Sequence, residues 1–365
     1  MKRNLLNFLL LSTIYLLLLL YLFTLNLKCF IENEQHKILL LKKDFFSVFG
    51  DFHDKTFELL NILEDDKIIN DENKKKIFFV ESHTNRDRKL EKPRQACSVE
   101  SAARINPDME VYFIFATNSS GIDMHFSDLI EALLSYKNIH LRFLNPKEFS
   151  VGTILEDLFQ KDKIKNSSYP VAHLSDILRV LLLYKYGGQY LDLDTITFTP
   201  VSFIRKENFA CAESKNIVAN GILNLDLKSG FQISYSYAKN LAEHYNPTSW
   251  GGNGPSMLTN VIKSFCPNVD LDDKKSTRCG NFTVLPQNKC YPIMYGEWSK
   301  MYQEEHTEKM LEKVENSKPY FIHFWNKMGD FENRRFELPF TSKSAYMELA
   351  KFHCPKVYKT IKKYF

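Results

Sequence analysis

Two aspartates placed two positions apart, Asp192 and Asp194, follow an apolar and aromatic run in the segment KYGGQYLDLDT, residues 185–195. On an extended backbone successive side chains alternate, so both carboxylates project to the same side, with their Cα atoms roughly 6.5–7 Å apart. Like charges this close repel unless they share a cation, protons or water. Carboxylate oxygens suit Mn²⁺ or Mg²⁺, so the pair predicts a divalent-metal site. The alternative is a pair of surface acids at a strand exit.

The segment before the aspartates favours a site over a surface pair. In HLSDILRVLLLYKY, residues 173–186, apolar residues recur at i, i+3, i+4 and i+7, which predicts a helix buried on nearly all sides. Gly187 and Gly188 end this helix. A hydrophobic strand then leads to the aspartates, and open α/β sheets bind ligands at the carboxyl ends of their strands.

Three kinds of chemistry use paired aspartates at such a position. A phosphatase of the haloacid dehalogenase type needs Thr or Val four residues after the first aspartate, where this chain has Ile196. An EF-hand loop needs an oxygen ligand at that same position. A sugar-nucleotide transferase uses the pair to bind a divalent cation, which neutralises the charge that develops on the leaving nucleoside diphosphate. The third chemistry fits these residues best.

The residues around this site predict an α/β fold. Strand-like and helix-like patterns alternate, which is typical of a mostly parallel sheet with flanking helices. The expected elements are a strand at 75–82, a helix at 93–105, a strand at 109–117, a helix near 126–136 and a strand at 139–144.

The N-terminus predicts a membrane anchor. Residues 8–25 carry no charge and approach the length that a bilayer core requires. Lys2 and Arg3 precede this run, which favours a cytoplasmic N-terminus. A cleaved signal peptide is the alternative, but its apolar core is usually only ~7–15 residues long. We therefore expect a cytoplasmic tail at 1–7, a transmembrane signal-anchor helix at 8–27, a stem at 28–74 and a lumenal catalytic domain at 75–365.

Sequons and cysteines agree with a lumenal body. Asn118, Asn166 and Asn281 each begin an N-glycosylation sequon. Of the seven cysteines one borders the anchor, and the other six suit disulfides, whose pairing the sequence leaves open. The formal net charge is only +4, with lysines spread among acids, so no nucleic-acid partner is expected.

Several segments resemble a known family, the α1,4-galactosyltransferases of the lactosylceramide type and the α1,4-N-acetylglucosaminyltransferases. The likeness spans about residues 77–330 and is carried by IFFVES, CSVESAARINP, SDILRVLLLYKYGGQYLDLD, NGILNLD, WGGNGPSMLTNV and FIHFWNK. The resemblance implies a type II Golgi membrane protein with a GT-A fold, which would be metal-dependent and would retain the anomeric configuration.

The resemblance also implies roles for individual residues. Asp192 and Asp194 would bind the metal, and Asp176 and Arg179 would contact ribose, sugar or phosphate. His323, in an aromatic stretch, is either a core histidine or a further metal ligand. As an i, i+3 pair on one helix face, Asp176 and Arg179 can instead pair with each other. The expected donor-binding set consists of Phe79, Glu81, Ser82, Asp176, Arg179, Asn253 and Gly254.

One segment departs from the family pattern. Where the family has His-Gln-Gly-Pro, this chain has Gly252, Asn253, Gly254 and Pro255. Asn is one methylene shorter than Gln but keeps the amide, so donor or acceptor preference is in doubt more than the reaction class.

Together these features predict a UDP-sugar hexosyltransferase. The favoured reaction moves galactose in α1,4 linkage to a galactose-ended glycolipid such as lactosylceramide. The alternatives are transfer of N-acetylgalactosamine or N-acetylglucosamine, a glycoprotein acceptor, or a non-catalytic sugar-binding protein of the same fold. A homo-oligomer is compatible with the sequence.

Overall fold

The computed structural model describes residues 63–82, 92–117, 127–204, 207–271, 275–326 and 337–365. The predicted tail, the signal-anchor helix at 8–27 and most of the predicted stem lie outside these ranges. Within them no helix is long and apolar enough to cross a membrane.

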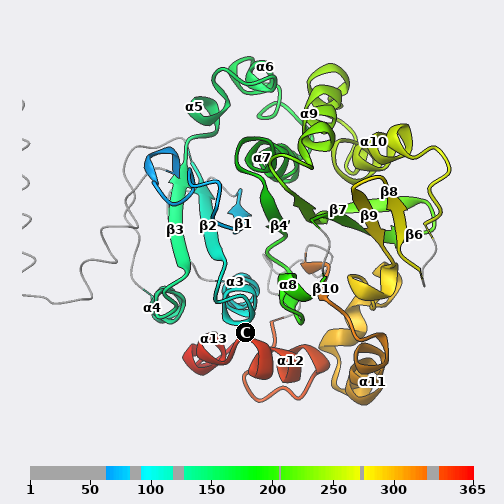
Figure 1. The fold of residues 1–365 in the computed structure, drawn as a ribbon. Coiled ribbons are helices and arrows are strands. Elements are labelled where there is room, and N and C mark those ends of the chain that lie inside the picture. The colour runs from blue at the N-terminus through cyan, green and yellow to red at the C-terminus, as the bar shows by residue number, and fades with distance from the viewer. Residues whose placement is uncertain (1–62, 83–91, 118–126, 205–206, 272–274, 327–336) are drawn as a thin grey trace, which may run out of the picture. The chain divides into compact units, whose positions relative to one another are not determined.

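The core is an eight-stranded sheet in the order β3-β2-β1-β4-β7-β6-β9-β8 (Figure 1). Strands β3, β2, β1 and β4 are parallel, whereas β7 runs antiparallel to both neighbours. The expected α/β sheet is thus confirmed as a mostly parallel, mixed sheet. Its strands are β1 (Lys76–Glu81), β2 (Glu110–Ala116), β3 (Ile139–Leu144), β4 (Gly188–Leu191), β6 (Asn208–Ser214), β7 (Ile217–Leu225), β8 (Thr277–Cys279) and β9 (Phe282–Leu285).

A second, two-stranded ladder joins distant parts of the chain. Strand β5 (Thr195–Thr197) pairs antiparallel with β10 (Phe321–His323). In this register His323 lies opposite Thr195. The ladder therefore brings the C-terminal FIHFWNK segment next to the paired aspartates.

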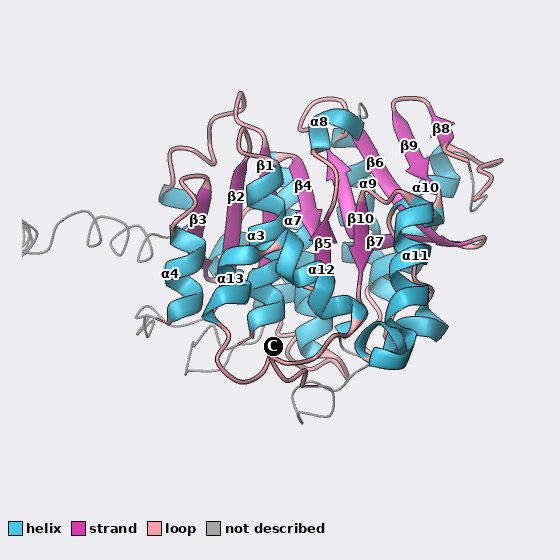
Figure 2. Ribbon diagram, turned by 90° about the horizontal axis from the view of Figure 1, so that it is seen from below, coloured by secondary structure: helices cyan, strands magenta, loops and turns pink. Residues whose placement is uncertain are grey.

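Helices cover both faces of the large sheet (Figures 1 and 2). One face packs against α3, α12 and α13, and the other against α7, α9 and α10. The longer helices are α3 (Pro93–Ile105), α4 (Asp128–Leu134), α7 (Pro170–Tyr186), α9 (Phe231–His244), α10 (Met257–Phe265), α11 (Thr307–Ser317), α12 (Ala345–His353) and α13 (Pro355–Thr360). Shorter helical segments are η1 (Leu63–Asp65), α5 (Pro146–Ser150), α6 (Glu156–Gln160), α8 (Val201–Ile204), η2 (Gly252–Ser256), η3 (Gln287–Lys289), η4 (Tyr295–Tyr302) and η5 (Glu304–His306).

Helix α7 behaves as its sequence predicts. It starts with Pro170 in its first turn and buries ten of its residues, including charged Asp176 and Arg179. Gly187 follows with φ +62°, a left-handed conformation that glycine adopts without a Cβ penalty. A Cβ on Gly187 would also lie 2.5 Å from the Leu227 amide nitrogen. The turn from α7 into β4 therefore requires glycine at this position.

Six cysteines of the described residues form three disulfides. They join Cys97 to Cys354, Cys211 to Cys290 and Cys266 to Cys279. The expectation that these six suit disulfides is confirmed, and the structure supplies the pairing. The first bond ties α3 to the C-terminal segment, across 257 positions of sequence.

Residues 63–74, which the sequence placed in the stem, pack against the sheet. Leu63 is fully buried, and the carboxylate of Asp66 forms a buried ion pair with Arg142 of β3 at 2.6 Å. The last part of the predicted stem thus contributes to the core of the folded body.

Candidate active site

Asp192 and Asp194 do not lie on one extended strand, which corrects the geometry expected from their spacing. Strand β4 ends at Leu191, and both aspartates belong to the turn that leads into β5. The turn is closed by Thr195, whose backbone N–H and hydroxyl both donate to the Asp192 carbonyl. The two carboxylates nevertheless converge, because the turn folds them toward the same partner.

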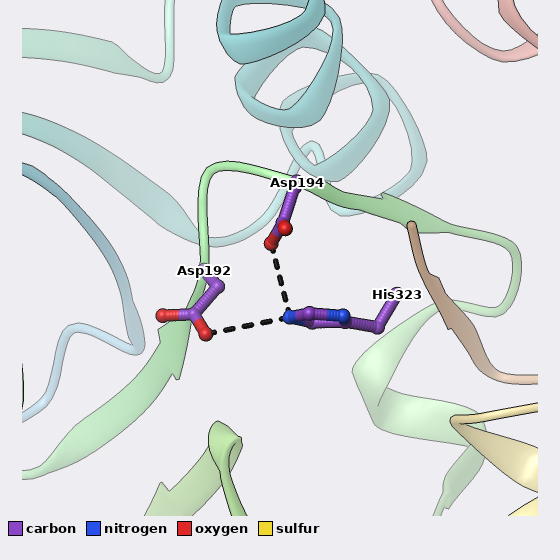
Figure 3. A group of neighbouring side chains, drawn as sticks. All are labelled: Asp192, Asp194 and His323. Atoms are coloured by element: carbon purple, nitrogen blue, oxygen red, sulfur yellow. Dashed lines mark ion pairs between the residues drawn. The ribbon is translucent and has the colours of Figure 1, made fainter. Parts of the chain in front are cut away.

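That partner is His323, at the end of β10 (Figure 3). Its Nε2 lies 3.0 Å from Oδ1 of Asp194 and 3.5 Å from Oδ2 of Asp192. The structure thus brings together all three residues that were candidates for the metal site. Ligand atoms of the three side chains lie within 4.8 Å of one another.

The donor set fits a divalent cation. Two carboxylates and one imidazole suit Mn²⁺, whose ligands include both oxygen and nitrogen. Gly221 on β7 adds a steric argument, because a Cβ there would lie only 2.5 Å from Oδ2 of Asp192. Glycine inside a strand often marks a site where another group approaches closely. The space beside Asp192 therefore depends on the missing side chain at position 221.

Asp192, Asp194 and His323 are called the metal group below. Arg179 of α7 forms an ion pair with Asp192 of this group. Its Nη1 lies 3.1 Å from Oδ1 of Asp192 and donates to the Asn220 carbonyl at 2.9 Å. Its guanidinium also stacks over the Tyr190 ring, 4.5 Å from the centroid. A buried guanidinium needs such anionic and polar partners, and here one of them is a metal-site carboxylate. Arg179 consequently fixes the orientation of Asp192.

Asp176 completes a buried charge network. Its Oδ1 lies 3.3 Å from Nη2 of Arg179 and accepts a hydrogen bond from Nδ2 of Asn220 at 2.8 Å. The two charged side chains of α7 therefore pair with each other, one of the two arrangements that their spacing allows. Gly254 lies against this network, since a Cβ there would be 2.8 Å from both Asn220 Nδ2 and Asp176 Oδ1.

The shifts in pKa follow from this network. Burial raises the pKa of Asp176 above its usual value, and Arg179 only partly opposes that effect. Burial acts the same way on Asp192, but Arg179 and His323 outweigh it and hold the pKa of that carboxyl below its usual range. Burial lowers the pKa of His323, yet Asp194 and Asp192 outweigh it and raise the pKa to about 10. A metal cation bound in place of the His323 proton would be attracted by the same two carboxylates, Asp192 and Asp194.

Asn253 lies beside the network but uses its side chain to hold its own loop. The residue is fully buried, and its Oδ1 accepts from the Asn246 N–H at 2.8 Å while its Nδ2 donates to the Asn246 carbonyl. The Tyr237 hydroxyl donates to the carbonyls of Asn253 and Gly254. The backbone of this loop is thus pinned close to Asp176.

The remaining expected donor-binding residues lie on β1, the strand beside β4. Phe79 is fully buried in the core under α3. Glu81 accepts a hydrogen bond from Gln95, and the Ser82 hydroxyl donates to the Val171 carbonyl at 3.0 Å. The last two stand at the carboxyl end of β1, where a nucleotide binds in open α/β sheets.

Sequence reasoning named the segment NGILNLD but gave no role to its Asn220 and Gly221, and it did not name Tyr291, although all three shape the site. Tyr291 is buried with its ring centroid 5.5 Å from that of His323. The Asn-Gly pair inside an apolar strand was a usable signal, because glycine weakens a strand unless something approaches it. Nothing comparable in the local sequence marks Tyr291.

Two of the three sequons lie in described residues. Asn166 and Asn281 are both exposed, whereas Asn118 lies outside the described ranges.

Comparison with known families agrees with this site. Residues 92–210 match the glycosyltransferase sugar-binding region containing the DXD motif, and residues 227–361 match the α1,4-glycosyltransferase conserved region. The fold and site thus define a DXD-type glycosyltransferase.

Individual relatives show to which family of glycosyltransferases the chain belongs. The human α1,4-N-acetylglucosaminyltransferase is 30% identical over 272 residues, which cover 73% of this chain and 75% of that protein. The mouse lactosylceramide 4-α-galactosyltransferase is 29% identical over 289 residues, covering 79% and 76%. Among solved structures, the galactosyltransferase LgtC with donor and acceptor sugar analogues aligns with a TM-score of 0.39 and 12% identity, over 77% of this chain and 95% of that one. The chain belongs to the α1,4-glycosyltransferase family.

Proposed function

We propose that this protein transfers a hexose, with galactose favoured, from a UDP-sugar in α1,4 linkage to a galactose-ended glycolipid such as lactosylceramide. The observation that carries the proposal is the group of Asp192, Asp194 and His323 at the carboxyl end of β4. The relatives named lactosylceramide 4-α-galactosyltransferase support the donor and acceptor classes.

Asp192, Asp194 and His323 would hold Mn²⁺ or Mg²⁺. When bound, the cation supplies positive charge to the diphosphate of the donor as the glycosidic bond breaks. The chain's own contribution is positional. Arg179 orients Asp192, the Asn326 N–H donates to Oδ2 of Asp194 at 2.9 Å, and these two contacts hold the carboxylates in place.

The nucleoside and the sugar of the donor would bind to different parts of the site. Glu81 and Ser82, at the end of β1, would contact the nucleoside, since β1 is the strand next to β4. Asp176, Arg179 and the Asn253–Gly254 backbone would lie against the ribose, sugar or phosphate. Preorganised charges of this kind favour the transition state because they need no rearrangement when the bond breaks. We propose that transfer retains the anomeric configuration.

The cellular setting is part of the same proposal. A signal anchor at 8–27, a cytoplasmic tail and a lumenal body would make this a single-pass type II Golgi membrane protein. Exposure of Asn166 and Asn281 is compatible with N-glycosylation there. An anchor also confines the enzyme to the surface where lipid acceptors reside, which raises their effective concentration.

A second candidate activity is transfer of an N-acetylhexosamine to a glycolipid or glycoprotein glycan. It is supported by the relative named α1,4-N-acetylglucosaminyltransferase, whose identity to this chain is 30%. A non-catalytic sugar-binding role is less well supported, because the charged residues of a transferase site are all in place.

The test is an assay of the full-length chain with Mn²⁺ and a panel of UDP-galactose, UDP-N-acetylgalactosamine and UDP-N-acetylglucosamine. Released UDP reports donor use, and NMR of the product on lactosylceramide reports linkage. UDP-galactose should give the highest rate and an α1,4-linked product. Failure to release UDP from any donor would contradict the transferase, and transfer to a glycoprotein but not to lactosylceramide would contradict the lipid acceptor.

A further inference from the structure

Strand β6 ends at the same edge of the sheet as the metal group. Strands β1 and β4 are parallel, and both β4 and β6 run antiparallel to β7, so β6 points the same way as β1 and β4. The carboxyl ends of the three strands therefore share one edge, with β4 between the other two in sheet order. Neighbouring strands lie about 4.8 Å apart, so β6 runs roughly 10 Å to the side of β4. Ala210 of β6 is level with Tyr190 of β4, because both pair with Leu223 of β7.

A carboxylate stands near this end of β6. Glu213 is the last residue but one of the strand. Ala212 pairs with Val218 and Ser214 pairs with Ile217, so Glu213 is an extra residue with no partner on β7. Such bulges disrupt the ladder and re-aim a side chain, and they occur often beside active sites.

Glu213 interacts electrostatically with His323 and Tyr291. Burial raises the pKa of its carboxyl, and His323 is the charged neighbour that opposes this shift. Burial likewise raises the pKa of Tyr291, and Glu213 is the foremost charge that adds to the effect. The Cys211–Cys290 disulfide, two residues before Glu213 and one before Tyr291, ties the two segments together. Glu213 therefore lies on the His323 and Tyr291 side of the site.

Among the described residues, the Glu213 carboxylate has no hydrogen-bond or ion-pair partner, and Glu213 does not belong to the three-residue metal group. It is partly exposed, so a ligand can reach it. A half-buried carboxylate without a protein partner is a strong acceptor for the hydroxyl groups of a sugar.

We propose that Glu213 binds a hydroxyl group of the acceptor sugar and so contributes to acceptor recognition. This inference rests on the proposed transferase function and deepens it. The edge order supplies the reason for choosing the acceptor over the donor. With the nucleotide proposed at the end of β1 and the metal at the end of β4, the end of β6 lies across β4 from the nucleotide, so a sugar bound there would be the acceptor.

The experiment compares the full-length wild type with Glu213→Gln, which removes the charge at nearly constant shape. Glu213→Asp, which keeps the charge on a shorter side chain, is a second variant. Glu243→Gln on α9, where the side chain is exposed, is the matched control. Three quantities are measured: UDP-galactose hydrolysis without acceptor, kcat/KM for methyl β-lactoside, and the Kd of methyl β-lactoside for the Mn²⁺–UDP complex by calorimetry.

Glu213→Gln should lower kcat/KM for the lactoside about 10–100-fold, the worth of a hydrogen bond to a charged group, mainly through KM. The lactoside Kd should rise in step, hydrolysis should stay within about twofold of wild type, and Glu213→Asp should fall between the two. An unchanged lactoside KM and Kd, or an equal loss of hydrolysis and transfer, would overturn the inference. No UDP release by the wild type would instead contradict the proposed function itself.

Discussion

Arg179 and Asp192 form the link between the buried core and the metal group. Nη1 of Arg179 lies 3.1 Å from one carboxylate oxygen of Asp192, and the other oxygen of Asp192 faces Nε2 of His323 at 3.5 Å. The Asp192 carboxylate thus contacts both Arg179 of the buried helix α7 and His323, which lies 131 positions after Asp192 in the sequence. Changes on either side of Asp192 should therefore alter its role as a ligand.

The first prediction concerns the two carboxylates. Asp192→Asn or Asp194→Asn removes an anionic ligand, and loss of one such transition-state interaction costs about 3–4 kcal/mol, or roughly 10²–10³ in rate. Steady-state UDP release with saturating Mn²⁺ measures the loss, and EDTA should abolish activity of the wild type. Asp157→Asn on the exposed face of α6 is the control and should leave the rate unchanged. Full activity in excess EDTA would refute the metal assignment.

Helix α7, the turn after it and the paired aspartates could be predicted from the sequence because their signals are local. The apolar periodicity of α7, its glycine break and the aspartates after the next strand all lie within residues 170–195. Local patterns of this kind depend on neighbours a few positions away, and those neighbours are visible in the sequence.

The rest of the site depends on contacts that no local pattern records. His323 reaches the aspartates through the pairing of β5 with β10, two strands that lie more than 120 positions apart in the sequence. The expected extended geometry of Asp192 and Asp194 was wrong because β4 ends at Leu191, before both aspartates, and Gly221 on β7 leaves room beside the Asp192 carboxylate. Likewise the bulge at Glu213 follows from the alignment of β6 on β7, which the sequence of β6 alone does not specify.

Gly221 supplies the second prediction. Gly221→Ala places a methyl group 2.5 Å from Oδ2 of Asp192, so the carboxylate must shift from its position. We expect Mn²⁺ affinity to fall about tenfold or more, the effect reported generally for groups that orient metal ligands. Titration of Mn²⁺ by calorimetry measures it. Gly296→Ala, where a Cβ would meet nothing within 4 Å, is the control. Equal Mn²⁺ affinity in both variants would show that Asp192 tolerates the added methyl group.

His353 gives the third prediction, on stability and pH. Burial, helped by Arg104, lowers the pKa of His353 from 6.5 to about 4 in the folded protein. The unfolded chain therefore binds this proton first as the pH falls, and the free energy of unfolding should drop progressively between about pH 6.5 and pH 4. Complete protonation of the unfolded form over that window corresponds to about 3 kcal/mol, and to about 1 kcal/mol by pH 5.5.

The measurement is chemical denaturation of the wild type and of His353→Gln at a series of pH values. Gln does not titrate, so the difference between the two proteins isolates this group from the carboxylates that also titrate in acid. The free energy of unfolding of the wild type minus that of His353→Gln should decrease as the pH falls from 6.5 to 4. A difference that stays constant with pH would mean that His353 titrates alike in both states.

The fourth prediction concerns Asn253, where the chain departs from the family pattern. Its side chain is buried and bonded to the backbone of Asn246, so the longer Gln in Asn253→Gln should displace the loop that the Tyr237 hydroxyl holds against Asp176. Because that loop lies next to the expected sugar position, kcat/KM for UDP-galactose relative to UDP-N-acetylgalactosamine should change more than the Mn²⁺ requirement does. Sites built on hydrogen bonds discriminate more strongly than apolar pockets, which makes a shift of about tenfold or more reasonable. Parallel kinetics with both donors measure the ratio, and Asn73→Gln on the surface serves as the control. A ratio equal to that of the wild type would place Asn253 outside the donor pocket.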